Sequence, residues 1–239
     1  MEIIVFDLWG DFGHFRVPYT TSSPITFPVP PKTSLYGIIG AILGYDKESY
    51  LEKFKKNKWF FAVSLRSPVT KFHIPQNFIN TKEVKMFARM PKGKSCRTRI
   101  NMEFLKDPYF RIYVLSDNII ELKKFKTLVK EHKAAYTPVL GISECIANFK
   151  FIGSFDIKEE VGNEFIEINS ILPLEDAIEI DFIQPGTKFL KIHMPTELNK
   201  NRELMESKDF IIEATARTIT AKVKKYIHIL ELNENIIMI

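Results

Sequence analysis

Hydrophobic positions in the first 153 residues form short strand-like runs separated by two helical stretches. Four runs are rich in β-branched and aromatic residues, as buried strands are, and they cover 2–8, 59–69, 109–115 and 146–152. Apolar residues recur at helical spacing in two stretches, 35–43 and 121–132. The order βαββαβ predicts a ferredoxin-like or RRM-like domain, with two helices on one face of a four-stranded antiparallel sheet. We expect the other face to stay free for ligands or partners.

The pattern changes after Gly153. The helix signal fades, and short strand-like runs follow at 164–168, 177–183, 188–193, 210–220 and 222–232. The chain is therefore predicted to be α+β, with an RRM-like domain over residues 1–153 and a small β-rich C-terminal module over residues 154–239.

Helix-capping signals surround the first helical stretch. Five prolines in residues 18–32 disfavour a helix there, so that stretch is predicted to be an ordered extended loop. Thr33 or Ser34 is the expected N-cap, and Gly44 the expected stop. The glycines at 37, 40 and 44 lie along one side of this helix, where we expect them to allow close packing on the sheet.

The basic charge of the chain is concentrated in one segment. Hydrophobic residues make up 45% and charged residues 26% of 239 residues, which is ordinary for a folded protein, and the net charge is only +5. From Lys71 to Lys106, however, nine basic residues and two acidic ones give +7, which leaves −2 for the rest. A polyanion is a plausible partner for such a segment.

Membrane insertion and disulfide bonding are not indicated. The apolar stretches at 35–45 and 236–239 are far shorter than the roughly 20 residues that cross a bilayer. Glu2 opens a strand-like run without the basic start of a signal peptide, so we expect a cytoplasmic protein with no membrane partner. Cys96 and Cys145 form no C-x-x-C pair, so neither a disulfide framework nor a zinc knuckle is predicted.

The five histidines show no catalytic pattern. No pair has the spacing of metal ligands, and none stands in a Ser-His-Asp context. His14 is the only one in the first 44 residues, and a lone histidine beside apolar residues is more often structural than a base. We predict no catalytic residue, no metal, no cofactor and no small-molecule substrate.

Two segments resemble a known family. Residues 6–44, FDLWGDFGHFRVPYTTSSPITFPVPPKTSLYGIIGAILG, resemble the N-terminal signature of the CRISPR-associated Cas5 family, especially its type I-B branch. The recognisable parts are the first strand, the Phe15-Arg16 pair, the Thr-Ser-Pro loop, the Pro30-Pro31 entry and the glycine-containing helix. Residues 136–144, YTPVLGISE, resemble the loop before the family's fourth strand. The resemblance covers roughly the first 150 residues.

This resemblance implies a function as well as a fold. Members of the family belong to the RAMP superfamily and lie at the foot of a Cascade complex in antiviral defence, where they grip the repeat-derived 5′ handle of crRNA. The implied partners are crRNA and the Cascade backbone and large subunits. A thumb inserted between the second and third strands is also implied. The matching insertion, about 70–108, is the basic segment that charge alone identifies.

The thumb supplies the first group of candidate RNA contacts. Arg97 and Arg99 alternate on one strand face, and Lys92, Gly93 and Lys94 form a flexible tip that could clamp phosphates. Arginine can also stack on an unpaired base. The alternative is a solvated loop whose charges only keep the protein soluble.

The first helix supplies the second group. Its N-terminus, at Lys32, Thr33 and Ser34, could bind a phosphate through unpaired backbone donors and the helix dipole, although simple capping is the alternative. After the first strand, Arg16 could bind phosphate, while Phe15 and Tyr19 could stack on bases or bury themselves. The predicted RNA-binding residues are Arg16, Lys32, Thr33, Ser34, Tyr36, Arg89, Lys92, Lys94, Arg97 and Arg99.

An enzymatic alternative comes from type I-C relatives that cut precursor RNA. These resemble metal-free ribonucleases that use a tyrosine near the first helix with a Lys-His pair. Tyr36 and Tyr45 flank the corresponding helix here, but the chain offers only the reversed pair His132-Lys133. Because a general base needs reach and orientation, we predict a non-catalytic subunit. A metal-independent endoribonuclease that processes precursor crRNA is the alternative, and an assembly hub with incidental RNA contact is a third hypothesis.

Overall fold

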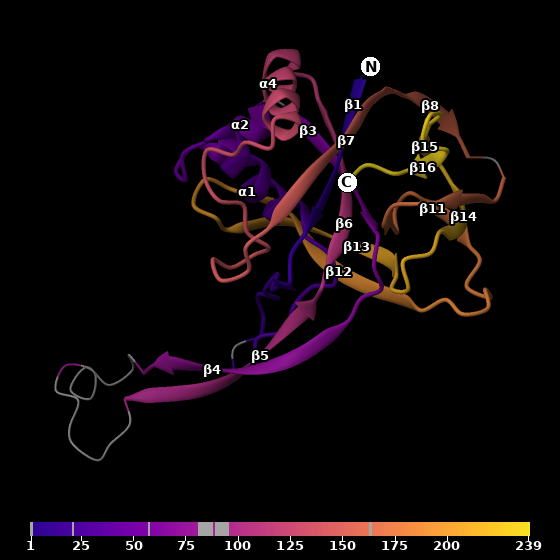
Figure 1. Ribbon diagram of the computed structural model, residues 1–239. Helices are drawn as coiled ribbons and strands as arrows, with labels where there is room; N and C mark the ends of the chain where they lie inside the picture. The colour runs from indigo at the N-terminus through magenta and orange to yellow at the C-terminus, as the bar shows by residue number, and fades with distance from the viewer. Residues whose placement is uncertain (1, 21, 57, 81–87, 89–95, 163) are drawn as a thin grey trace.

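A four-stranded antiparallel sheet organises the first part of the molecule (Figure 1). The computed structural model describes residues 2–20, 22–56, 58–80, 88, 96–162 and 164–239. The strand order is β3-β6-β1-β7. The strands are β1 (Glu2–Trp9), β3 (Trp59–Leu65), β6 (Tyr109–Ser116) and β7 (Asn148–Asp156). All four predicted strands are therefore present, and their ends shift by a few residues.

Helices cover one face of this sheet. They are α1 (Lys32–Leu43), α2 (Tyr50–Lys56) and α4 (Ile119–Lys130), of which α2 was not predicted. Alternate residues of β1, including Phe6 and Leu8, join the same hydrophobic cluster as the apolar sides of α1 and α4. The ring of Phe6 meets that of Phe125 edge-on at 5.6 Å. Within the described ranges, no helix is long and apolar enough to span a membrane.

The start of α1 differs from the prediction. Pro31 is the N-cap, with φ −58° and ψ 156°, and no side chain caps the helix. The backbone amide of Ser34 donates to the carbonyl of Pro31 at 2.9 Å. The fixed φ of proline already sets the helix entry, so Thr33 and Ser34 fall inside the first turn and the predicted N-cap is wrong. Gly44 does end the helix in the left-handed conformation, at φ 77°.

The expected close packing of the α1 glycines on the sheet is also wrong in part. Gly37 is exposed, and a methyl group added there would meet nothing within 4 Å. Gly40 is buried, but its nearest neighbour would be the ring of Phe54 in α2, at 3.5 Å. The small residue therefore makes room for the unpredicted helix α2.

The opposite face of the sheet is not free, which corrects the prediction. Ile3 and Val5 of β1 and Tyr113 of β6 form a buried cluster with Ile227 and Ile236. The latter two lie on strands of the three-stranded sheet β16-β15-β8, whose bounds are β8 (Lys158–Val161), β15 (Lys225–Ile229) and β16 (Glu234–Ile236). Figure 1 shows β15 and β16, in yellow, on the side of the sheet away from α4. Apolar residues of the C-terminal strands cover this face because they must be buried against another apolar surface, and this face of the sheet provides one.

The chain after Gly153 folds into small antiparallel sheets, as the β-rich pattern predicts. Besides β16-β15-β8, their orders are β10-β13-β12 and β11-β14-β9. The bounds are β9 (Ile166–Ile168), β10 (Leu172–Pro173), β11 (Ala177–Ile180), β12 (Phe189–Leu198), β13 (Leu204–Glu213) and β14 (Ile219–Val223). Met194 and Phe210 join the hydrophobic cluster that contains the helices. The domain boundary at residue 153 stays a prediction.

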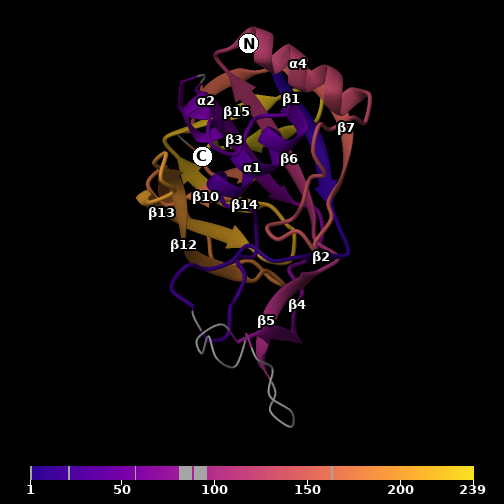
Figure 2. The same cartoon turned by 90° about the vertical axis from the view of Figure 1, so that its left-hand side faces the viewer.

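A long hairpin extends away from the rest of the molecule (Figures 1 and 2). Strands β4 (Lys71–Ile79) and β5 (Arg97–Lys106) pair in register from Lys71 opposite Leu105 to Ile79 opposite Arg97. The short strand β2 (Phe12–Gly13) joins β5 at the base of the hairpin. Along the chain, the hairpin is inserted between β3 and β6, as predicted. Arg89, Lys92, Gly93 and Lys94 lie outside the described residues.

Candidate nucleic-acid interface

A groove of about 800 Å³ lies against one face of the hairpin base. Three segments distant in sequence form its walls: the stretch from β2 to Pro24, the hairpin, and the segment 142–145. Most of the lining is apolar, and it comprises Phe12, Pro24, Ile74, Phe78, Ile100, Met102, Phe104, Ile142 and Cys145, with His14, Arg16, Gln76, Ser143 and Glu144 as polar members. Phe12 and Phe78 keep 41% and 44% of their surface exposed, so the rim of the groove is aromatic.

Strand alternation separates this groove from the predicted arginines. Ile74 is opposite Met102 and Phe78 is opposite Thr98, so these even-numbered positions share the groove face. Arg97 and Arg99 occupy the alternate positions of β5 and are exposed. They share one strand face, as predicted, but it is the face turned away from the groove.

His14 is the one buried polar side chain in the described lining of the groove. Its side chain keeps only 1% of its surface exposed, and its Nδ1 lies 2.7 Å from the backbone carbonyl of Glu103. Because a carbonyl only accepts, Nδ1 carries the hydrogen and Nε2 is left with a free lone pair. Among the described residues, Nε2 has no hydrogen-bond partner. Burial lowers the pKa of His14, opposed by the hydrogen bond to Glu103, so the neutral ring is favoured.

Gly141 allows the second wall to approach His14. The backbone amide of His14 donates to the carbonyl of Leu140 at 2.9 Å. Gly141 has φ 95°, and a methyl group there would lie 2.0 Å from the carbonyl oxygen of His14. Only glycine fits both the conformation and the space. The two segments that resemble the Cas5 family, 6–44 and 136–144, therefore meet at this histidine.

Arg16 lies at the groove on an exposed loop position. Its only described side-chain hydrogen bond is a long one, 3.4 Å from Nη2 to the carbonyl of Thr20. The loop itself is fixed, because Thr26 pairs with Arg16 in a β-bridge and its amide donates to the carboxylate of Glu103 at 3.0 Å. The structure thus places Arg16, a predicted RNA contact, at the same groove as His14.

The neighbouring aromatics of Arg16 have different surroundings. Phe15 is buried, with 2% of its surface exposed, and its ring packs on Phe110 at 6.2 Å. Tyr19 is 75% exposed. Phe15 therefore follows the burial alternative, whereas the ring of Tyr19 is open to solvent.

The N-terminus of α1 borders a different cavity, of about 300 Å³, which Glu197 of β12 and Glu206 of β13 also line. Burial lowers the pKa of Lys32, with a further contribution from Lys208, while Glu206 and Glu197 act in the opposite direction. Thr33 and Ser34 are partly buried. The two carboxylates make this end of the helix less favourable for a phosphate than the sequence suggests.

Tyr36, the next predicted contact, is held in an aromatic stack. Its ring lies 4.8 Å from that of Phe54, and 9% of its surface is exposed. Burial raises the pKa of Tyr36 above its ordinary value, and Glu197 makes a smaller contribution in the same direction. The hydroxyl therefore stays protonated in the physiological range.

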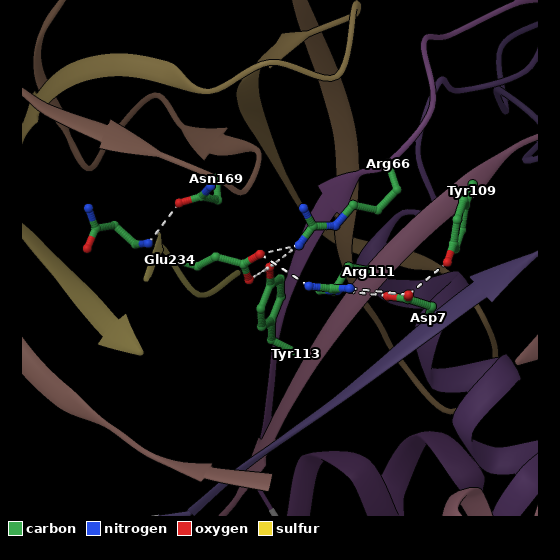
Figure 3. Close-up of polar contacts among 8 residues, drawn as sticks. Asp7, Arg66, Tyr109, Arg111, Tyr113, Asn169 and Glu234 are labelled. Carbon is green, nitrogen blue, oxygen red and sulfur yellow. Dashed lines mark hydrogen bonds and ion pairs between the residues drawn. The ribbon is translucent and has the colours of Figure 1, made fainter. Parts of the chain in front are cut away.

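A cluster of ionisable groups lies elsewhere, on the covered face of the sheet (Figure 3). Arg111 donates to Asp7 through Nε at 2.8 Å and to Glu234 through Nη1 at 3.2 Å. Glu234 also accepts from Arg66 and, at 2.6 Å, from the hydroxyl of Tyr113. Asp7 and Glu234 are 3% and 7% exposed. Every carboxylate here has partners, so the network ties β16 to the sheet and leaves no free acceptor.

Sequence reasoning missed the groove, although a signal for it exists. Within the basic segment, apolar residues alternate at 72, 74 and 78 and again at 100, 102 and 104. This period of two predicts strands with one apolar face. Among the described residues, no group of three or more His, Cys, Asp or Glu side chains could hold a metal ion.

Comparisons with known proteins give a family from one family model and a shared fold from solved structures. The model of a family described as CRISPR-associated protein (Cas_Cas5) matches residues 3–194. No curated protein matches the chain significantly. A CRISPR protein from Archaeoglobus fulgidus has a similar structure, with a TM-score of 0.55 and 15% identity over 98% of this chain and 97% of that one. A chain of a CRISPR RNA-guided surveillance complex also gives 0.55, at 11% identity over 92% of each chain. At such identities, these structures inform the fold alone.

Proposed function

Because this chain belongs to the CRISPR-associated Cas5 family, and so has a RAMP fold, we propose that it is a non-catalytic RNA-binding subunit of a CRISPR surveillance complex. Its RNA is the repeat-derived 5′ handle of crRNA, and its role is to help assemble a type I Cascade complex in antiviral defence. The Cascade backbone and large subunits are its protein partners. The similarity to a chain of an RNA-guided surveillance complex supports this assignment.

The two-faced hairpin is the observation that carries the proposal. One face bears the exposed Arg97 and Arg99 within a segment of net charge +7, and the other forms the apolar wall of the groove. Single-stranded RNA presents phosphates along its backbone and flat apolar faces on its bases. A surface with cations on one side and aromatic walls on the other suits both parts of such a strand. The strand order β3-β6-β1-β7, with α1 and α4 on one face, supports the RRM-like interpretation of the domain that carries it.

The environment of the two tyrosines supports a non-catalytic role. The ring of Tyr36 is stacked on Phe54. The hydroxyl of Tyr45 donates to the carboxylate of Glu121 at 2.7 Å, which links α1 to α4. Both side chains are at least 90% buried. A nucleophile or general base must reach its substrate, and the burial of both rings and the hydrogen bond of Tyr45 to Glu121 oppose that reach.

Salt-dependent binding tests the proposal. The doubly substituted Arg97→Ala/Arg99→Ala protein is compared with a Lys224→Ala/Lys225→Ala control, which removes the same charge from exposed positions of the C-terminal part. With single-stranded handle RNA, loss of two phosphate contacts should flatten the salt slope by about 1.4, and the control should keep the wild-type slope. An unchanged slope in the first protein would remove the arginines from the interface. Site-specific cleavage of repeat RNA in chelator, lost on Tyr36→Phe or Tyr45→Phe, would establish the endoribonuclease instead.

A further inference from the structure

We propose that the groove beside the hairpin receives one base of the bound RNA, and that Nε2 of His14 accepts a hydrogen bond from the exocyclic amine of that base. The inference rests on the proposed RNA-binding function and assigns it a base-reading position. The ligand class is a nucleobase that carries an amine on its Watson–Crick edge opposite the glycosidic bond, as adenine and cytosine do.

The size and walls of the groove suit a base. A volume of about 800 Å³ is ample for one nucleotide unit, and the walls come from Phe12, Phe78 and Phe104 together with aliphatic side chains. The exposed flanks of Phe12 and Phe78 leave apolar surface in water that a stacked base would cover. Arg16 at the same groove can hold the adjoining phosphate.

The chemistry of the groove selects a donor. Buried polar atoms in proteins normally have partners, so an unpartnered one that is 1% exposed calls for an explanation. Among the described residues, two further buried side-chain atoms have no hydrogen-bond partner, Nε1 of Trp59 and Nε of Arg66. Neither residue lines the groove. Because the carbonyl of Glu103 fixes the hydrogen on Nδ1, the unpartnered Nε2 of this lining residue is an acceptor. The carboxylate of Glu144, also in the lining, is a second acceptor. A ligand that brings N–H donors into the groove, such as a base amine, matches the chemistry of these acceptors.

Binding of matched RNAs to the full chain tests the inference. The first pair of probes is a short oligoadenylate and the same oligomer made of unsubstituted purine, which lacks the amine. The second pair is oligocytidylate and its analogue without the 4-amino group. We expect wild-type protein to bind at least one amine-bearing RNA about tenfold more tightly than its partner, since an unpaired buried acceptor penalises the analogue. In His14→Phe, which keeps a ring and removes the acceptor, this preference should disappear. His193→Phe, on β12 outside the groove, should retain it.

The failures of the two proposals differ. If single-stranded RNA binds but both pairs bind equally to wild-type protein, the base-reading position is overturned and RNA binding stands. A preference that persists in His14→Phe also overturns it. If neither these probes nor handle RNA binds, the proposed function itself fails. Should His14→Phe not fold, the nitrogen resonance of Nε2 in the wild type replaces it. Adenosine or cytidine monophosphate should shift that resonance more than its analogue without the amine does, and equal behaviour within both pairs of nucleotides would contradict the inference.

Discussion

Two buried polar arrangements, one on the face of the sheet that the C-terminal strands cover and one at the groove beside the hairpin, differ in whether they leave a hydrogen-bond acceptor free. Around Glu234 and Asp7, two arginines and two tyrosine hydroxyls donate to every carboxylate oxygen (Figure 3). At the groove, His14 uses one ring nitrogen and leaves the other without a partner among the described residues. The first arrangement leaves no acceptor free, although Nε of Arg66 has no partner among the described residues, and it holds the C-terminal strands in place. The second keeps one acceptor unused, which the proposed base amine would engage.

The presence or absence of a free acceptor, and not the type of residue, distinguishes the structural role of the network from the binding role that we propose for His14. Charged clusters attract attention as candidate sites, but a cluster whose carboxylate oxygens all have donors offers a ligand no free acceptor. A single neutral histidine has that capacity because its surroundings fix the tautomer and bury the free nitrogen. The substitutions below should therefore affect stability at the network and recognition at the groove.

The largest effect is expected from Glu234→Ala. Removal of this 7% exposed carboxylate leaves Arg66 and part of Arg111 without their anionic partner. Breaking such a buried pair costs about 3–5 kcal/mol of the free energy of unfolding. Glu231→Ala, an exposed glutamate with the same charge, is the matched control and should change stability by less than about 0.5 kcal/mol. Equal denaturant midpoints for the two variants would show that the network is not structural.

Gly141→Ala should come next and should damage the groove as well as stability. The methyl group would meet the carbonyl of His14 at 2.0 Å, in a backbone conformation with φ 95° that alanine disfavours. We expect a loss of about 3 kcal/mol. Gly37→Ala is the control, because its methyl group meets nothing within 4 Å and helix propensity favours it by up to about 1 kcal/mol. If Gly141→Ala unfolds like the wild type, segment 136–144 does not constrain His14.

The sequence predicted the framework better than the site. Strands rich in β-branched residues and an amphipathic helix at 119–130 depend on local pattern, so their order was recoverable. The covering of the sheet by β15 and β16, and the acids beside Lys32, depend on residues that lie far away in the chain. His14 looks ordinary in sequence because its role depends on the carbonyl of Glu103 and on Gly141. Local periodicity cannot report such contacts.

Arg16 and Lys32 offer a smaller test, in which two predicted RNA contacts have unlike surroundings. Arg16 is exposed at the groove, whereas Lys32 shares its cavity with Glu197 and Glu206. Arg16→Gln should weaken binding of handle RNA roughly fivefold, as the loss of one charge-assisted contact does, and Lys32→Gln should change it less than about twofold. The reverse order, measured by titration at one salt concentration, would show that the helix N-terminus binds phosphate despite its acids.

The smallest effect is the pH dependence of stability that His14 contributes. Burial lowers its pKa in the folded protein from the ordinary value of 6.5. Above that value the ring is neutral in both states, and its contribution to stability is complete. As pH falls below 6.5, the unfolded chain takes up the proton first, so stability declines until the pKa of the folded state is reached. Stability therefore falls in this window, and His14→Phe should remove part of the decline.

Urea unfolding at about pH 7.5 and about pH 5.5 measures this difference, since the interval brackets the ordinary histidine pKa. The carboxylates whose pKa values are lowered by their partners, such as Glu2 and Asp209, lose their contribution only at lower pH, so they do not obscure it. His73→Phe is the control, because this ring is exposed on the outer face of β4 and the variant should keep the wild-type decline. If His14→Phe and His73→Phe decline alike, His14 is not held neutral by burial. The contrast between a network whose carboxylate oxygens all have donors and a groove with a free acceptor would then lose its chemical basis.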